Sequence, residues 1–210
     1  MENELLKRIL SSIILIPVTL FFIIKGNYFF NFFIFFCLII SVYEWNTISK
    51  NTRYKIPGIL FLIFSFYTAY YMRNEIFGSY LYFLIILFIC IFTDIGGYVF
   101  GNIFKGPKLT KISPNKTYAG VFGGYFCSII FLYIFLNITK MEMVNINFLF
   151  FTILISTISQ LGDIFISYFK RKSKIKNTGK IIPGHGGLLD RIDGIIFAFP
   201  ASFLIFKIIY

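Results

Sequence analysis

Residues 183–193 have the sequence Pro-Gly-His-Gly-Gly-Leu-Leu-Asp-Arg-Ile-Asp, and these side chains could do chemistry together. They combine a glycine loop with the only histidine of the chain, an arginine and two carboxylates, and an apolar segment follows directly. Glycines let the backbone approach an anion closely, and the start of a helix presents N–H groups to it. The stretch therefore predicts a phosphate and metal site where a membrane-spanning helix begins.

The chain has four aspartates, each within or at the edge of a hydrophobic segment: Asp94, Asp163, Asp190 and Asp193. A carboxylate near the bilayer centre costs about 2.5–3.5 kcal/mol, so such residues usually face a cavity and carry function. Asp190 and Asp193, three residues apart, would share one face of a helix and repel each other without a cation nearby. With Asp163 they are the predicted ligands of Mg²⁺, and a second cation is allowed. The alternative is structural ion pairing with Arg191 or loop lysines.

Two polar loops surround these acids. In the first, six cations lie between residues 170 and 180, a run that usually marks a membrane surface. The glycines beside His185 are candidates for phosphate contacts: Gly184, Gly186 and Gly187. His185 itself could act as a general acid or base, or donate a hydrogen bond to phosphate.

The second loop, residues 111–120, contains Ser113-Pro114 and then Lys116-Thr117 before an apolar segment. Lys116 and Thr117 would lie at a helix N-terminus, a position suited to phosphate. The alternative is a simple Ser-Pro turn followed by Gly120, Gly123 and Gly124, which would let helices pack closely.

Composition excludes an ordinary soluble domain, because 58% of the residues are hydrophobic and only 14% are charged. We expect an all-α polytopic membrane bundle with about seven transmembrane helices of about 20 residues each. The expected spans are 5–24, 28–45, 57–74, 79–104, 118–138, 146–169 and 187–208. The fourth should be interrupted by Gly96-Gly97 and Gly101, and the first should remain as an anchor helix. Residues 1–210 would form one domain, with N-terminal spans in 1–90 and catalytic spans and loops in 91–210.

Positive charges alternate between rich and poor connections along the chain, whose net charge is +11. The positive-inside rule then predicts a cytoplasmic N-terminus. Both polar loops, 105–117 and 170–187, would face the cytoplasm, in a bacterial inner membrane. The three cysteines lie singly in separate apolar segments, without the spacing of metal ligands.

The pattern resembles the signature of the phosphatidate cytidylyltransferases, also called CDP-diacylglycerol synthases. The matching positions run from Ser167 through Lys170-Arg171, Lys176, Gly179, Pro183 and His185-Gly186-Gly187 to Asp190-Arg191-Ile192-Asp193. Upstream, Asp94, Gly96-Gly97-Tyr98, Gly101, Lys111-Ile112-Ser113-Pro114, Lys116-Thr117 and Gly162-Asp163 resemble a second region of that family. The resemblance covers roughly residues 90–205. Asn177 and Ala119 depart from it, because the family usually has acidic residues there.

The resemblance implies an enzyme that joins CTP to phosphatidate from the cytoplasmic leaflet, giving CDP-diacylglycerol and pyrophosphate with Mg²⁺. The implied catalytic residues are Asp163, Asp190, Asp193, Lys170, Arg171, His185 and Arg191. The implied substrate-binding residues are Asp94, Ser113, Lys116, Thr117, Lys176, Gly184, Gly186 and Gly187. Within these sets, Lys170, Arg171 and Lys176 are the candidates for triphosphate contacts. No nucleic-acid partner is expected, and a homodimer is compatible with the sequence.

Three other hypotheses remain open. A CTP-dependent lipid kinase of the polyprenol or phytol type would transfer the γ-phosphate instead. An ion-coupled transporter would also place acids within the membrane. The departures at Ala119 and Asn177 would also fit an inactive relative.

Overall fold

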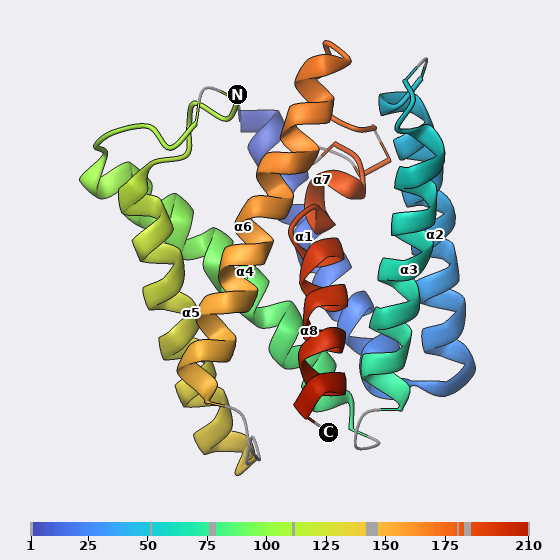
Figure 1. The fold of residues 1–210 in the computed structure, drawn as a ribbon, viewed down its shortest axis with the longest axis vertical. Coiled ribbons are helices and arrows are strands. Elements are labelled where there is room, and N and C mark those ends of the chain that lie inside the picture. The colour runs from blue at the N-terminus through green and yellow to red at the C-terminus, as the bar shows by residue number, and fades with distance from the viewer. Residues whose placement is uncertain are drawn as a thin grey trace. The chain divides into compact units, whose positions relative to one another are not determined.

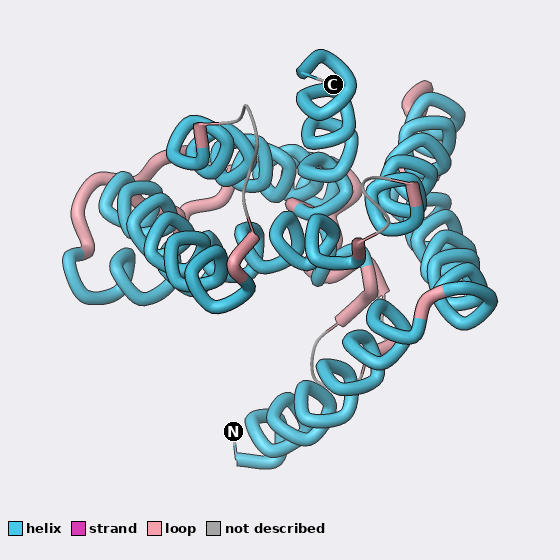
Figure 2. Tube along the Cα trace, turned by 90° about the horizontal axis from the view of Figure 1, so that it is seen from below, coloured by secondary structure: helices cyan, strands magenta, loops and turns pink. Residues whose placement is uncertain are grey.

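The computed structural model describes residues 2–50, 52–75, 79–110, 112–141, 147–179, 181–182 and 186–209, with side chains given from residue 13 to residue 208 of these. In these ranges the chain forms helices and loops, with two isolated bridges and no strand (Figures 1 and 2). The helices are α1 (Glu2–Lys25), α2 (Asn27–Ile48), α3 (Lys55–Asn74), α4 (Tyr80–Phe104), α5 (Tyr118–Thr139), α6 (Phe148–Lys172), α7 (Leu189–Ile192) and α8 (Ile195–Ile209). The predicted all-α class is confirmed.

Five of these helices, α2 to α6, are long and apolar enough to cross a membrane. They agree with the expectation of a polytopic membrane bundle, and α1 and α8 contribute shorter apolar stretches, Ile13–Lys25 and Ile195–Ile208, within the described residues. Five long spans follow the expected segments because each is a continuous apolar run of sufficient length.

Two details of the predicted helices are wrong. The span expected at 187–208 is not one helix, because Asp193 and Gly194 form a turn between α7 and α8. Helix α4 runs unbroken through Gly96, Gly97 and Gly101. Those glycines do not interrupt α4, because its backbone hydrogen bonds continue through them while they make room for a neighbouring helix.

The chain divides into two compact units, each built from two separate stretches of the sequence. Unit 1 contains Met1–Tyr80 and Phe169–Ile192, and unit 2 contains Leu81–Tyr168 and Asp193–Tyr210. The acids and cations predicted to form the site are therefore shared between units. Asp190, Lys170 and the glycine loop belong to unit 1, while Asp163, Asp193 and Lys116 belong to unit 2.

In unit 1, α2 packs along α3 and also against α1 and α7 (Figure 1). Arg73 near the end of α3 donates hydrogen bonds from Nε and Nη2 to the carbonyl of Ile23, both at 3.1 Å. Its guanidinium also lies over the ring of Phe30, 5.5 Å from the centroid. Because the last carbonyls of a helix lack internal partners, Arg73 satisfies the end of α1 and ties three helices together.

In unit 2, α4 and α5 approach closely where both have glycines. A Cβ on Gly96 would meet the carbonyl of Gly123, and a Cβ on Gly120 would lie 2.7 Å from the carbonyl of Gly97. Such small residues allow helix backbones to approach within a membrane. The alternative that we gave for these glycines, close helix packing, is therefore confirmed.

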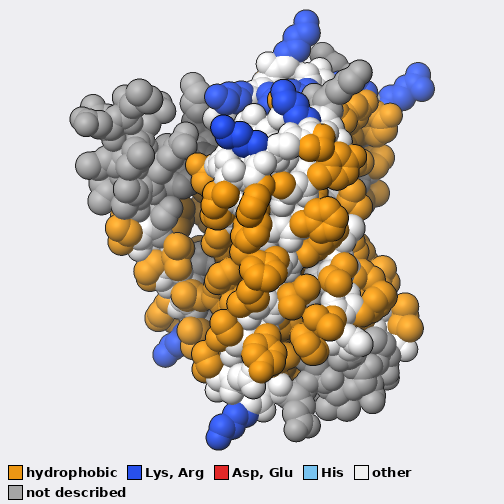
Figure 3. Space-filling model, turned by 90° about the vertical axis from the view of Figure 1, so that its left-hand side faces the viewer, with side chains coloured by type: hydrophobic (Ala, Val, Ile, Leu, Met, Phe, Trp, Pro, Cys, Tyr) orange, Lys and Arg blue, Asp and Glu red, His pale blue; other side chains and the backbone are white. Residues whose placement is uncertain are grey.

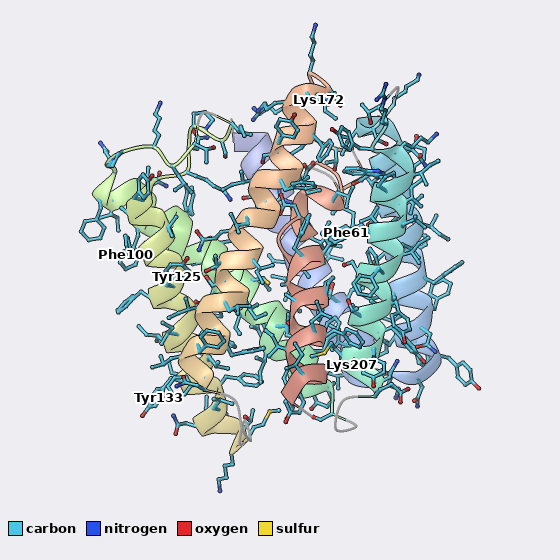
Figure 4. The ribbon with its side chains drawn as sticks, viewed as in Figure 1. Phe61, Phe100, Tyr125, Tyr133, Lys172 and Lys207 are labelled. Atoms are coloured by element: carbon cyan, nitrogen blue, oxygen red, sulfur yellow. The ribbon has the colours of Figure 1, made fainter. Side chains whose placement is uncertain are left out.

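Polar bonds join the same helices to α6. Tyr125 on α5, labelled in Figure 4, shares a 2.9 Å hydrogen bond with Thr157, and Thr93 on α4 donates one of 2.8 Å to Ser156. Thr93 and Ser156 are buried. These bonds position α6, which carries Asp163.

The outer surface of unit 2 is apolar along the helices. Helix α5 exposes Phe122, Phe126 and Tyr133, with exposed fractions of 69%, 56% and 61%. Figure 3 shows one face on which hydrophobic side chains dominate the middle, and Lys and Arg side chains gather at the ends. Large exposed apolar surfaces on long helices are typical of contact with lipid.

Candidate active site

The centre of the site in unit 1 is an ion pair between Lys170 and Asp190. Lys170 Nζ lies 2.9 Å from Asp190 Oδ1, and the two side chains are only 11% and 8% exposed. Lys170 comes from the last turns of α6, and Asp190 from the first turn of α7. Because the pair is shielded from water, removing either partner would leave a buried charge without its counterion.

The second oxygen of Asp190 organises the loop between these helices. Asp190 Oδ2 accepts hydrogen bonds from the backbone N–H of Thr178 at 2.8 Å and of Gly187 at 3.0 Å. Gly186, which has φ of +91°, has no room for a side chain because its Cβ would lie 2.8 Å from the same oxygen. Gly186 and Gly187 thus let the loop close around a carboxylate of the protein itself.

A second carboxylate, Glu44 of α2, holds the start of α7. Its Oε1 accepts the backbone N–H of Leu188 at 2.9 Å, and its Oε2 accepts that of Leu189 at 2.8 Å. The hydroxyl of Thr178 donates to Oε2 as well, at 2.9 Å. The N–H groups at the start of α7, which we expected to meet phosphate, are occupied by Glu44.

Most of the remaining loop cations are exposed, in contrast to Lys170. Arg171, Lys174 and Lys176 are open to solvent. Lys172, labelled in Figure 4 at the end of α6, lies over the ring of Tyr54 at 4.8 Å from the centroid. The run of six cations therefore contains one buried lysine, and at least four of the other five are exposed.

Unit 2 contains a second ion pair between predicted site residues. Lys116 Nζ lies 2.5 Å from Asp163 Oδ2 and also donates to the carbonyl of Gln160 at 3.3 Å. Asp163 Oδ1 accepts a hydrogen bond from Ser167 at 3.2 Å. The side chains of Lys116 and Asp163 are 23% and 26% exposed, so solutes can reach both. The 105–117 loop and α6 thus meet at a charged, accessible point.

The other predicted residues of unit 2 have varied surroundings. Thr117 is the N-cap of α5, and its hydroxyl accepts the N–H of Gly120 at 3.1 Å. The N–H of Ser113 donates to Thr110 in the loop. Asp94 is exposed on α4, whereas Asp193 is buried and its Oδ1 accepts the N–H of Gly194 at 3.0 Å.

Asp193 corrects the expected geometry of the paired acids. Asp190 lies in α7, but Asp193 lies in the turn after it, so the two do not share a helix face. Arg191, between them, is exposed. Gly184 and His185, as well as Pro183, Lys111 and Lys180, lie outside the described residues, so their predicted roles stay predictions.

The sequence model of the cytidylyltransferase family matches residues 6–79 and 58–209 of this chain. The chain belongs to the cytidylyltransferase family. A protein of Staphylococcus epidermidis named phosphatidate cytidylyltransferase is 37% identical over 167 residues, or 76% of this chain and 63% of that protein. Proteins of the same name from Staphylococcus aureus and Staphylococcus saprophyticus are 37% and 34% identical, with 63% and 62% of their length covered. The chain thus spans somewhat less than two thirds of these curated relatives.

The carboxylates of the site were predicted to bind a metal. Within the part of the chain that the structure describes, no group of three or more His, Cys, Asp or Glu side chains is placed to hold a metal ion. Asp163 and Asp190 are each neutralised by a lysine instead. Carboxylate oxygens are ligands that Mg²⁺ prefers. The assignment of Asp163, Asp190 and Asp193 as its ligands stays a prediction.

Sequence reasoning missed Glu44. It considered the aspartates in apolar segments and passed over the one glutamate inside an expected span, 28–45. The same argument about the cost of an intramembrane carboxylate would have singled it out. Its partners, 134 to 145 residues further along the chain, could not be read from spacing.

Proposed function

We propose that this chain is a phosphatidate cytidylyltransferase, which transfers CMP from CTP to phosphatidate and releases pyrophosphate. Membership of the family supports a nucleotidyl transfer. The observation that carries the proposal is the construction of the segment from Lys170 to Asp190. There a buried lysine is fixed against a carboxylate whose other oxygen closes a glycine loop. Such a fixed cation in a water-poor setting suits a reaction in which negative charge accumulates.

In the proposed reaction a phosphate oxygen of phosphatidate attacks the α-phosphorus of CTP, and the bond to the β-phosphate oxygen breaks. The nucleophile is already anionic, so no strong general base is needed. Lys170, with Arg171 and Lys176, would bind and orient the triphosphate. Lys116 of unit 2, whose ammonium group is accessible, stays a predicted substrate-binding residue.

The proposal retains the predicted Mg²⁺ and its carboxylate ligands. When bound, Mg²⁺ would supply neutralisation of the triphosphate, and Asp163, Asp190 and Asp193 would hold it. We also propose that the protein lies in a bacterial inner membrane with its site on the cytoplasmic side, as the distribution of Lys and Arg favours. Phosphatidate would then enter from the cytoplasmic leaflet.

The test uses purified protein in detergent with phosphatidate, Mg²⁺ and CTP labelled in parallel at the α- or the γ-phosphate. CMP transfer moves the α-label into the lipid fraction and the γ-label into pyrophosphate. A polyprenol or phytol kinase, given its lipid alcohol in a parallel reaction, would instead move the γ-label into lipid and leave the α-label in CDP. An ion-coupled transporter or an inactive relative would move neither label. Transfer of the γ-label into lipid, or no transfer of either label, would overturn the proposal.

Two matched lysine variants sharpen the test. Lys170→Met should lower the rate about 100-fold or more, because it removes a fixed charge from the site. Lys172→Met removes an exposed cation two residues away and should change the rate only a few-fold. Equal losses in both variants would point to general surface charge and contradict the assignment of Lys170.

A further inference from the structure

Glu44 is a fully buried acid near the end of an apolar helix, with no exposed surface. A carboxylate in such a place is stable only when donors satisfy it. Glu44 receives three hydrogen bonds: one from the hydroxyl of Thr178 in the loop between α6 and α7, and two from the backbone N–H groups of Leu188 and Leu189 where α7 begins. Glu44 of α2 therefore helps to fix the conformation of that loop.

Thr178 connects Glu44 with the predicted catalytic acid. Its hydroxyl donates to Glu44 Oε2 at 2.9 Å, while its backbone N–H donates to Asp190 Oδ2 at 2.8 Å. Thr178 is 3% exposed, so both bonds are shielded from water. A displacement of Glu44 would thus be transmitted through one residue to Asp190.

The glycines of the loop fit the same arrangement. A Cβ on Gly179 would lie 2.7 Å from Glu44 Oε1, and a Cβ on Gly187 would lie 2.6 Å from that oxygen. The backbone at Gly179 and at Gly187 therefore lies too close to the carboxylate, as it is held here, to leave room for a side chain.

We propose that Glu44 is a positioning residue, which acts as an internal anion at the start of α7 and fixes the loop that presents Asp190. The proposal rests on the proposed function for its catalytic consequence. It also changes the expected source of phosphate contacts. Because Glu44 occupies the N–H groups of Leu188 and Leu189, those two groups would not bind the triphosphate, and the proposed contacts are the cationic side chains of Lys170, Arg171 and Lys176.

The experiment compares Glu44→Gln with Ser41→Ala. Glutamine keeps the shape, but its N–H₂ group must oppose either the N–H of Leu188 or the N–H of Leu189 and the hydroxyl of Thr178, so at least one of the three hydrogen bonds is lost. Ser41 lies one turn earlier on α2, is equally buried, and bonds to the carbonyl of Cys37 in its own helix at 2.8 Å. Ser41→Ala therefore controls for a change in the core of α2 that does not touch the loop.

The first measurement is limited trypsin digestion of the folded protein in detergent, followed at the exposed Lys174 and Lys176. Cleavage there should be about 10-fold or more faster in Glu44→Gln than in wild type, because the loop opens more often without its anchor. Ser41→Ala should cleave at the wild-type rate. This measurement does not depend on catalysis, so it remains informative if the proposed function fails.

The second measurement is the steady-state kinetics of CMP transfer with CTP and phosphatidate varied in turn. Glu44→Gln should lower kcat/KM for CTP about 10- to 100-fold, with little change in KM for phosphatidate. Thr178→Val removes one of the three bonds and should give a smaller loss. It also provides the test if Glu44→Gln does not fold.

These outcomes distinguish the positioning role of Glu44 from the proposed function. Faster cleavage together with a lower kcat/KM for CTP supports the positioning role. Wild-type cleavage, or a loosened loop with unchanged kinetics, overturns it. An equal effect of Ser41→Ala also overturns it, since the effect would then belong to α2 packing. No CMP transfer by wild type, with faster cleavage in Glu44→Gln, would refute the proposed function and leave the anchor established.

Discussion

The substitution Asp190→Asn tests whether the buried ion pair holds the loop as the structure indicates. Asparagine has the same shape, but one carboxylate oxygen becomes an N–H₂ group. If that group faces Lys170, two cationic or donor groups oppose each other. If it faces the loop, it opposes the N–H groups of Thr178 and Gly187. Neither orientation satisfies all the partners.

The magnitude follows from the burial of the pair. With side chains only 11% and 8% exposed, water cannot solvate the lysine that remains. Breaking a buried pair by altering one partner costs about 3–5 kcal/mol. For a chain of this length that free energy lowers the Tm by roughly 6–20 °C. The effect on stability should appear whether or not the protein is active.

The assay is thermal unfolding in detergent of wild type, Asp190→Asn, Lys170→Met and the double variant. The double variant should lose less than the sum of the single losses, with a coupling of at least about 1 kcal/mol, because it leaves no unpaired buried charge. Arg171→Met, an exposed neighbour, serves as the control and should change stability by about 0.5 kcal/mol or less.

Two results would refute this reasoning. An Asp190→Asn protein with the Tm of wild type would mean that the carboxylate does not hold the loop. Strict additivity of the two single variants would mean that Lys170 and Asp190 are stabilised independently of each other.

Two further predictions concern the packing of the helices. Gly123→Val should lower the stability of unit 2 by about 1–3 kcal/mol, since its side chain would overlap Phe100 and a backbone carbonyl of α4. The control is Phe122→Ala, at an exposed neighbour, which should have little effect on Tm. An equal loss of stability in both variants would contradict close α4–α5 packing. Arg73→Met should lower stability by roughly 1–2 kcal/mol through lost bonds to the end of α1. Hydrogen exchange at residues 20–25 would then be faster, with exposed Arg53→Met unchanged, and unaltered exchange in Arg73→Met would exclude that bond.

Much of the fold could be predicted because length and hydropathy decide where a membrane helix can form. The five long spans have no other stable conformation in a bilayer, where every backbone group needs a partner in its own helix. The turn at Asp193-Gly194 was missed because hydropathy averages over a window and two residues hardly change it. The continuity of α4 was missed because glycine in a membrane helix serves packing as often as bending.

The site could be predicted only in its residue types. Spacing identified Asp190, Lys170 and the glycines as a group, and the structure brings these residues together in unit 1. Spacing could not show which donors meet which acceptors. The loop glycines were assigned to phosphate because glycine commonly approaches anions, and here the nearest described anions are Asp190 and Glu44.

Burial separates residues that the sequence presents as equals. The six cations between 170 and 180 form one uniform run, but α6 continues to Lys172 and so keeps Lys170 within its shielded part. In the proposed reaction an incoming triphosphate would therefore meet exposed cations such as Arg171 and Lys176 first. Lys170, which is buried, would contact it through an N–H that Asp190 does not occupy, because an ammonium group has three donors. Asp190 would then hold the lysine in place while the lysine binds phosphate.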